Sequence, residues 1–167
     1  MSARAQRLAR HNAWWLWLSF AVIALDQASK QLVATHFYLF ESVRLTGFLN
    51  LTYVRNTGVA FSLFTREPRL VFIGVGVLIS LAILVWLYRH PRGDGLAAAA
   101  LALILGGALG NVIDRALWGY VIDFIDVHVG AWHWPAFNVA DSAVTIGAAL
   151  LILDAFWPRR EADADAD

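Results

Sequence analysis

The chain alternates long apolar runs with short polar segments. The most uniform run extends from Leu70 to Tyr88 without a charged residue, and Arg69 and Arg89 bracket it. An α-helix of this length spans about 28 Å, close to the hydrocarbon thickness of a bilayer, which is about 30 Å. The run therefore predicts a transmembrane helix.

Three further apolar runs predict three more spans, over about residues 14–34, 96–113 and 142–157. The first follows a basic start, which is also typical of a cleavable signal peptide. However, its helical pattern continues through Asp26 and Lys30, and no small-residue cleavage site follows. A first transmembrane helix is the better interpretation.

Residues 36–69 have a mixed polar and apolar pattern, rich in β-branched and aromatic residues. Such a pattern indicates a small β-hairpin or cradle, with Gly47 as a turn residue. Asn56-Thr57-Gly58 is a second turn signal. The Asn56 amide could alternatively hold a peptide carbonyl and N–H of a ligand, because it both donates and accepts hydrogen bonds.

Basic residues suggest the orientation of the four spans. They occur in the tail 1–12, in the loop around Arg89 and Arg92, and at Arg159–Arg160, all on the same side of a four-span protein. The positive-inside rule places that side in the cytoplasm, although several arginines in the 36–69 region weaken the bias. The 36–69 region and the 117–140 loop would then face outward.

Composition supports a membrane protein, since 59% of the 167 residues are hydrophobic and 16% are charged. Soluble domains are usually about 45–50% apolar and about 25% charged. The prediction is an all-α membrane protein with four transmembrane helices and a small extracytoplasmic β-cradle. Residues 13–158 would form its single domain, between cytoplasmic tails 1–12 and 159–167. A net charge of zero gives no indication of nucleic-acid binding, and the absence of Cys excludes thiolate chemistry.

Polar residues are dense between the last two spans, where ionisable groups near lipid are costly, at about 2.5–3.5 kcal/mol each at a helix centre. Asp123 and Asp141 lie at the outer ends of these consecutive, antiparallel spans, so their proximity is easily achieved. Two close carboxylates share a proton, which lets one activate water while the other polarises a carbonyl. The structural alternatives are an exposed loop acid for Asp123, and for Asp141 the third residue of a helix capped by Asn138.

Two other constellations allow both structural and functional interpretations. Asp26 and Lys30 are spaced i, i+4, as an ion pair that either neutralises itself in the bundle or faces a substrate cavity. Asn111, Asp114 and Arg115 share one helix face. They either tie the third span to its neighbours or contact a polar substrate backbone.

Asp123, Asp126, His128 and His133 are metal-ligating residue types close together in the sequence. They contain no His-Glu-x-x-His pattern, and the two histidines have no helical register. We expect no metal site.

Five short motifs together resemble the lipoprotein signal peptidases, or signal peptidase II, over about residues 14–158. They occur in that family's order and with its spacing relative to the spans. The motifs are Asp26-Gln27-Ala28-Ser29-Lys30, Asn56-Thr57-Gly58-Val59-Ala60-Phe61, Gly110-Asn111-Val112-Ile113-Asp114-Arg115, Val121-Ile122-Asp123-Phe124 and Phe137-Asn138-Val139-Ala140-Asp141-Ser142.

The resemblance implies an intramembrane aspartic endopeptidase of the bacterial inner membrane. It would remove the signal peptide from diacylglyceryl-modified prolipoproteins, cutting before the lipidated cysteine, and globomycin would inhibit it. The implied catalytic pair is Asp123 and Asp141. The implied substrate-binding or supporting residues are Asp26, Lys30, Asn56, Asn111, Arg115 and Asn138. No cofactor is implied, and we expect a monomer in contact with membrane lipid.

A non-enzymatic four-helix protein with a charged core, such as a small transporter or assembly subunit, is the competing class. A small exporter centred on Asp26 is a second alternative. The separation of Asp123 and Asp141 discriminates, because a proteolytic pair must place its carboxyl oxygens within about one hydrogen bond or one water of each other.

Overall fold

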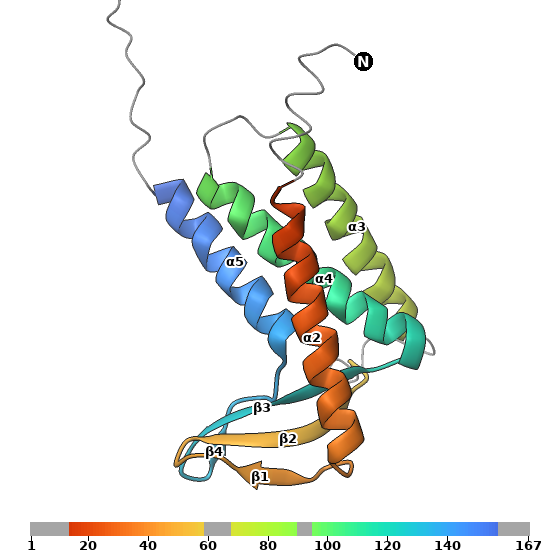
Figure 1. The fold of residues 1–167 in the computed structure, drawn as a ribbon, viewed down its shortest axis with the longest axis vertical. Helices are drawn as coiled ribbons and strands as arrows, with labels where there is room; N and C mark the ends of the chain where they lie inside the picture. Colours follow the sequence, from red (N-terminus) through yellow and green to blue (C-terminus); the bar gives the residue numbers. More distant parts are fainter. Residues whose placement is uncertain (1–13, 59–67, 90–94, 157–167) are drawn as a thin grey trace, which may run out of the picture.

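A computed structural model describes residues 14–58, 68–89 and 95–156. The two predicted tails, residues 1–12 and 159–167, lie outside the described residues, as does most of the basic loop after Arg89. Within the ranges that the structure describes, four helices form one bundle with a small sheet at one end of it (Figure 1). The predicted combination of apolar helices with a small β-region is confirmed.

The helices are α2 (Leu16–His36), α3 (Pro68–Arg89), α4 (Gly95–Trp118) and α5 (Val139–Phe156). Among the described residues, three helices are long and apolar enough to cross a membrane, namely α3 from Arg69, α4 and α5. Helix α2 is 21 residues long and carries charged side chains in its middle. The expected fourth span therefore remains a prediction.

The sheet is antiparallel, with strands β1 (Ser42–Arg44), β2 (Leu49–Asn56), β3 (Val121–Val129) and β4 (Trp132–His133) in that order. The predicted hairpin is the β1–β2 pair. The larger part of the sheet is the pairing of β2 with β3, a segment that the sequence analysis described only as a loop. Strand β3 is rich in Val and Ile, which favour strands, and its first four residues are all buried.

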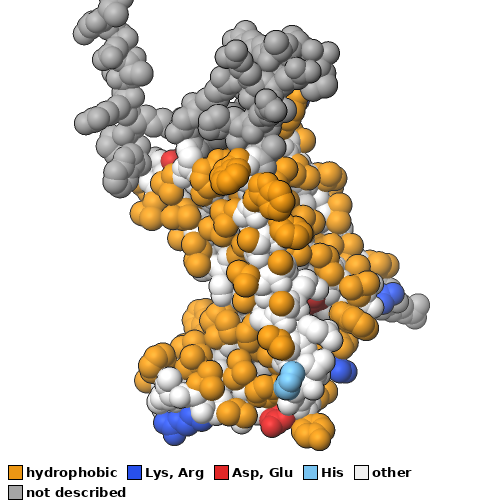
Figure 2. Space-filling model, viewed as in Figure 1, with side chains coloured by type: hydrophobic (Ala, Val, Ile, Leu, Met, Phe, Trp, Pro, Cys, Tyr) orange, Lys and Arg blue, Asp and Glu red, His pale blue; other side chains and the backbone are white. Residues whose placement is uncertain are grey.

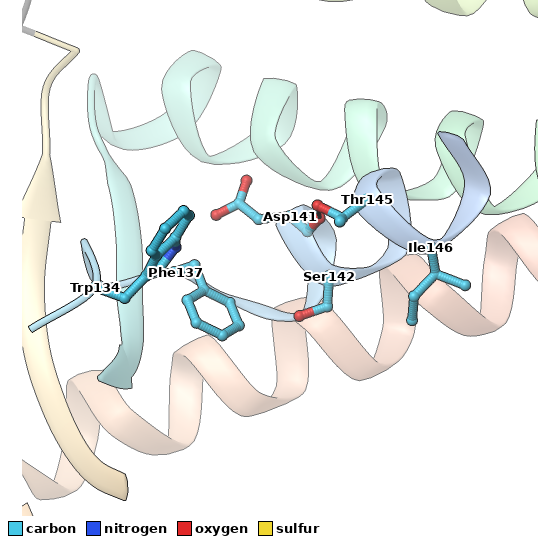
Figure 3. A pocket seen from close by; sticks show the side chains of 6 residues that line it. All are labelled: Trp134, Phe137, Asp141, Ser142, Thr145 and Ile146. Carbon is cyan, nitrogen blue, oxygen red and sulfur yellow. Dashed lines mark hydrogen bonds between the residues drawn. The ribbon is translucent and has the colours of Figure 1, made fainter. Parts of the chain in front are cut away.

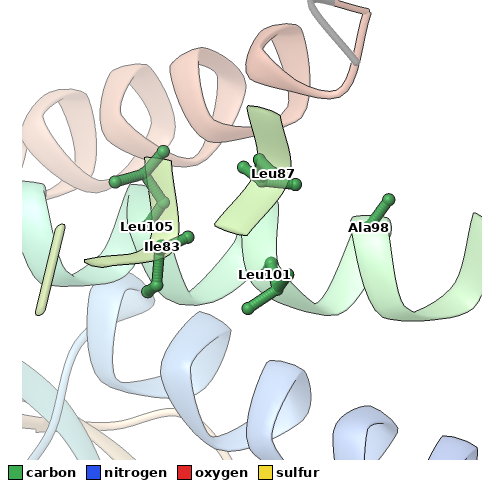
Figure 4. Packing of buried hydrophobic residues seen from close by; sticks show 5 residues of the cluster. All are labelled: Ile83, Leu87, Ala98, Leu101 and Leu105. Atoms are coloured by element: carbon green, nitrogen blue, oxygen red, sulfur yellow. The ribbon is translucent and has the colours of Figure 1, made fainter. Parts of the chain in front are cut away.

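Helix α4 is the centre of the bundle, because α2, α3 and α5 all pack against it. Its glycines allow the close approach predicted from the sequence: a Cβ on Gly107 would collide with the carbonyl oxygen of Ala140, in the first turn of α5. In the N-terminal half of α4, an apolar cluster joins this helix to α3 (Figure 4). The cluster consists of Ile83, Leu87, Ala98, Leu101 and Leu105.

A second apolar cluster joins the end of α2 to the sheet and comprises Val33, Tyr53, Ile122 and Phe124. It holds β3 beneath the helices, which places the polar side chains of β3 at the ends of α4 and α5. On the face shown in Figure 2, hydrophobic side chains cover much of the helical part. Exposed apolar surface of this extent is typical of contact with lipid.

Candidate active site

Two acidic residues lie where the sheet joins the bundle. Asp123 lies on β3 and is only 2% exposed, so the alternative interpretation of Asp123 as an exposed loop acid is wrong. Asp141 lies in the first turn of α5 and is half-buried. The β3 backbone is hydrogen-bonded to the residue before Asn138, with Phe124 N–H donating to the Phe137 carbonyl at 2.9 Å. This bridge holds the start of α5 beside the strand.

Side-chain amides surround the two acids and donate to them. Asp123 accepts from Asn138 Nδ2 at its Oδ1 (2.7 Å) and from Asn56 Nδ2 at its Oδ2 (3.0 Å). Asp141 accepts from Asn111 Nδ2 at its Oδ1 (2.8 Å) and from the backbone N–H of Asn138 at its Oδ2 (3.3 Å). Each of the four carboxylate oxygens therefore has a donor, which fixes both carboxylate planes.

Asn138 connects the two acids through one side chain. Its Oδ1 accepts the Asp141 N–H at 2.9 Å, so the predicted N-cap is confirmed. Because the cap occupies the amide oxygen, the NH₂ group is directed to Asp123. The capping of the helix turn that carries Asp141 and the hydrogen bond to Asp123 are thus made by the same side chain.

Lys30 determines which way the Asn111 amide points. Lys30 Nζ lies 3.0 Å from Asn111 Oδ1, and an ammonium group can only donate hydrogen bonds. The oxygen of Asn111 must therefore face Lys30, which leaves its NH₂ group for Asp141. Lys30 is linked to Asp141 through Asn111 and is 2% exposed.

Lys30 is also paired with two acids from different helices. Its Nζ lies 2.7 Å from Asp26 Oδ2 and 2.9 Å from Asp114 Oδ2. The predicted Asp26–Lys30 pair is confirmed, and Asp114 ties α4 to α2 as its structural interpretation proposed. Gln27, to which the sequence analysis gave no role, donates to Asp114 Oδ1 at 2.8 Å and completes this network. A polar residue beside Asp26 in an apolar helix was the signal that could have identified it.

Burial raises the pKa of Asp123 to about 6. The hydrogen bond from Asn56 opposes this effect, whereas the negative charge of Asp141 adds to it. Asp123 therefore retains a proton well above the ordinary pH range of a carboxyl group. A buried acid with a raised pKa beside a second acid is the arrangement in which two carboxylates share one proton.

The comparisons with known proteins agree on one family. A family model described as signal peptidase (SPase) II matches residues 18–157. The chain belongs to the signal peptidase II family. It is 50% identical over 145 residues to the lipoprotein signal peptidase of Photorhabdus laumondii subsp. laumondii, covering 85% of this chain and 87% of that protein. Its identity to the lipoprotein signal peptidase of Yersinia enterocolitica is also 50%, over 85% of this chain and 86% of the relative.

Two solved structures share the architecture of this signal peptidase II family member. Both are described as bacterial membrane enzymes. The first has a TM-score of 0.81 at 31% identity and covers 88% of this chain and 95% of its own. The second has a TM-score of 0.79 at 30% identity, with 92% of this chain and 95% of its own covered.

Arg115 lies beside the acids without a hydrogen bond to either of them among the described contacts. Its Nη1 donates to the Asn111 carbonyl at 3.3 Å, and its guanidinium lies 4.9 Å from the ring centroid of Phe72. It is close enough to Asp141 and Asp123 for electrostatic interaction. The sequence prediction that Arg115 contacts substrate remains a prediction.

The residues considered as metal ligands divide into two groups. His133 Nδ1 lies 2.8 Å from Asp126 Oδ1, and the His133 ring stacks on the ring of His128. Asp123 instead accepts hydrogen bonds from Asn56 and Asn138. Within the described ranges, no three metal-ligating side chains converge on one point. Asp126 also accepts from Asn50 Nδ2 at 2.8 Å, so it joins β2 to β3.

A pocket of about 480 Å³ opens beside Asp141 (Figure 3). One wall is the side of α5, and the other comes from the segment that leads into this helix. The lining residues are Trp134, Phe137, Asp141, Ser142, Thr145 and Ile146. The sequence analysis identified Asp141 but had no signal for the pocket, because its two walls meet only through the turn before α5.

Proposed function

We propose that this protein is an intramembrane aspartic endopeptidase. It removes the signal peptide from diacylglyceryl-modified prolipoproteins and cuts before the lipidated cysteine. The main observation behind this proposal is that one side chain, Asn138, donates to the Asp123 carboxylate and accepts the backbone N–H of Asp141. Membership of the signal peptidase II family and the printed name of the relatives, lipoprotein signal peptidase, support the substrate class.

The two acids have different environments, which suggests their roles. Asp141 is half-buried and lines the pocket, so it is the base that takes a proton from water. Asp123 is buried and carries the shared proton, which it gives to the oxygen of the scissile carbonyl. Water oxygen bonds to the carbonyl carbon in the same step, so a neutral tetrahedral diol forms while the proton inventory of the pair is conserved.

Collapse of the diol returns both acids to their starting protonation states. Asp141 gives its proton to the leaving nitrogen as the carbon–nitrogen bond breaks. One diol hydroxyl returns its proton to Asp123 and becomes the carbonyl oxygen of the new carboxylic acid. Asn56, Asn111 and Asn138 hold the carboxylates in place throughout, which is the positional contribution that accelerates such a step. No metal or organic cofactor takes part.

We place the protein in the bacterial inner membrane with four spans, both termini cytoplasmic and the dyad near the outer face. Helix α2 serves as the first span because its buried charges neutralise each other: Lys30 pairs with Asp26 and Asp114 inside the bundle. The apolar exteriors of α3, α4 and α5 support the membrane location. The sheet then lies at the outer surface, where it cradles the substrate of a monomeric enzyme.

The competing classes fit the contacts less well. In a small exporter centred on Asp26, that acid would face a transport pathway. Instead Asp26 is fully buried, paired with Lys30, and accepts the backbone N–H of Ala140 at 2.9 Å. A purely structural charged core also gives no reason for a buried acid with a raised pKa at Asp123.

The deciding experiment incubates the purified protein in detergent micelles with a prolipoprotein bearing diacylglyceryl on its cysteine. We expect cleavage before that cysteine, inhibition by globomycin, and a large drop in rate for the same substrate without the lipid. Equal rates for the two substrates would indicate another kind of membrane peptidase. No cleavage of either would favour a non-enzymatic protein.

A further inference from the structure

The pocket beside Asp141 has walls that suit an apolar ligand. Two of its lining residues are hydroxyl-bearing, but both hydroxyl protons are already used. Ser142 Oγ donates to the Asn138 carbonyl at 2.9 Å, and Thr145 Oγ1 donates to the Asp141 carbonyl at 2.8 Å. A bound peptide backbone would need donors and acceptors to replace its water hydrogen bonds. These two hydroxyls present no free proton for that purpose.

The remaining walls are aromatic and aliphatic. Phe137 and Trp134 form one side, and Ile146 lies at the end of the pocket farthest along α5 (Figure 3). Asp141 is the only ionisable group among the six lining residues. The pocket therefore pairs one reactive carboxylate with an apolar chamber, whose volume of about 480 Å³ is within the usual range of ligand sites, about 300–1,000 Å³.

The pocket is also open to the side of the bundle. The Ile146 side chain is 54% exposed, and it lies on a helix that is apolar enough to cross a membrane. From Asp141 to Ile146 the helix advances about 7.5 Å away from the sheet. A ligand that extends from Asp141 along this wall therefore runs toward the apolar middle of the bundle, in the direction that lipid chains take.

We propose that this pocket binds an acyl chain of the lipidated substrate and thereby holds the modified cysteine beside Asp141. This inference rests on the proposed function. It assigns a subsite to the lipid, because a fatty chain needs no hydrogen-bonding partner and enters laterally from the bilayer. An apolar side chain of the signal segment is the rival occupant, and the experiment below separates the two.

The test fills the pocket by Ile146→Trp and uses Ile152→Trp as the matched control. Ile152 lies on the same helix with a similar exposure, 59%, but outside the pocket. The two substrates share one peptide sequence and carry either long or short acyl chains. Because each buried methylene changes affinity about fourfold, the wild-type protein should prefer the long-chain substrate by at least about tenfold in kcat/KM.

We expect Ile146→Trp to reduce this long-to-short preference in kcat/KM to about threefold or less. Ile152→Trp should keep the wild-type preference. An equal loss on both substrates would assign the pocket to the peptide, and an unchanged preference in Ile146→Trp would place the lipid elsewhere; either result overturns the proposal.

A second measurement does not depend on turnover. A substrate with a photoreactive diazirine near the middle of one acyl chain should label wild-type protein within residues 134–146. Labelling confined to α3 or α2 would contradict the subsite. If the wild-type protein labels there but cleaves no lipidated substrate, the proposed function fails while the lipid site stands. Cleavage without labelling in this segment would contradict the proposed lipid subsite but not the proposed function.

Discussion

Asp26 Oδ1 accepts the backbone N–H of Ala140 at 2.9 Å, so a side chain of α2 caps the first turn of α5. The same turn carries Asp141, and Asn138 caps its next amide. The first amides of a helix have no partner within the helix and must find one elsewhere. Here two different elements supply these partners, which makes the position of Asp141 a consequence of the packing of α2 against α5.

Asp123→Asn and Asp141→Asn should each abolish cleavage while the protein remains folded, because an amide can neither supply nor take the proton. Asp126→Asn is the matched control on the same strand, since its partners are Asn50 and His133 rather than the dyad. Its activity should stay within about threefold of wild type, as expected for a residue outside the chemistry. Substantial turnover by either of these two purified variants would contradict the proposed mechanism.

The rate should fall as pH rises through about 6. The proposed mechanism needs one proton on the two acids, and Asp123, whose pKa burial raises to about 6, loses that proton at higher pH. Since the hydrogen bond from Asn56 lowers the pKa of Asp123, Asn56→Ala should move this alkaline limb to higher pH. The measurement is kcat/KM against pH for both proteins, and a downward shift in Asn56→Ala would contradict the assignment. The limb belongs to the coupled pair of acids.

The same raised pKa has a consequence for stability. Between a pH of about 4 and about 6, the folded protein binds more protons at Asp123 than the unfolded chain does, so the free energy of unfolding falls as pH rises. We expect the wild-type melting temperature to decrease over this interval. Asp123→Asn should remove this component, and an unchanged pH dependence in that variant would place the titration elsewhere.

Asn138→Ser and Asn138→Ala should separate helix capping from the bridge to Asp123. Ser caps a helix nearly as well as Asn, so Asn138→Ser should be more stable than Asn138→Ala by about 1 kcal/mol. Neither side chain offers the NH₂ group that reaches Asp123 at 2.7 Å, so both variants should lose cleavage by about 100-fold. Full activity in Asn138→Ser would show that Asn138 acts only as a cap.

Lys30→Ala should destabilise the protein more than Asp26→Asn does. Removal of Lys30 leaves Asp26 and Asp114 as buried acids without their cation, and stranding a buried charge costs about 3–5 kcal/mol. Asn at position 26 removes one of these charges and keeps an oxygen for the Ala140 N–H. Thermal unfolding of the two variants in the same detergent measures the difference, and equal melting temperatures would contradict this account of the network.

Gly107→Ala should destabilise the protein and lower its activity, because the new Cβ would collide with the Ala140 carbonyl oxygen and displace the first turn of α5. Gly74→Ala is the matched control. A Cβ at Gly74, in α3, would meet nothing within 4 Å, so the change should be neutral or stabilising by up to about 1 kcal/mol. Similar melting temperatures for the two variants would show that α4 and α5 can separate at little cost.

The local pattern of residues was sufficient for the helices and for the hairpin. Uniform apolar runs set where α3 and α5 lie, and the mixed pattern after His36 indicated β1 and β2. The i, i+4 spacing of Asp26 and Lys30 was likewise enough to predict their ion pair. These features depend on residues a few positions apart, and the period of the backbone relates such residues directly.

The sequence by itself determined a membrane-type helical fold, its family resemblance and the two candidate acids, Asp123 and Asp141. Only the tertiary structure decided that Asp123 lies on a buried strand, that Asn138 joins it to Asp141, and that Asp26 caps α5. Those contacts depend on how α2, β3 and α5 pack, and the Asp26–Ala140 bond joins residues 114 positions apart. Hydrophobic periodicity specifies which face of an element is buried, but which polar groups then meet is a property of the assembled bundle, because each buried donor must find an acceptor among whatever elements packing brings near it.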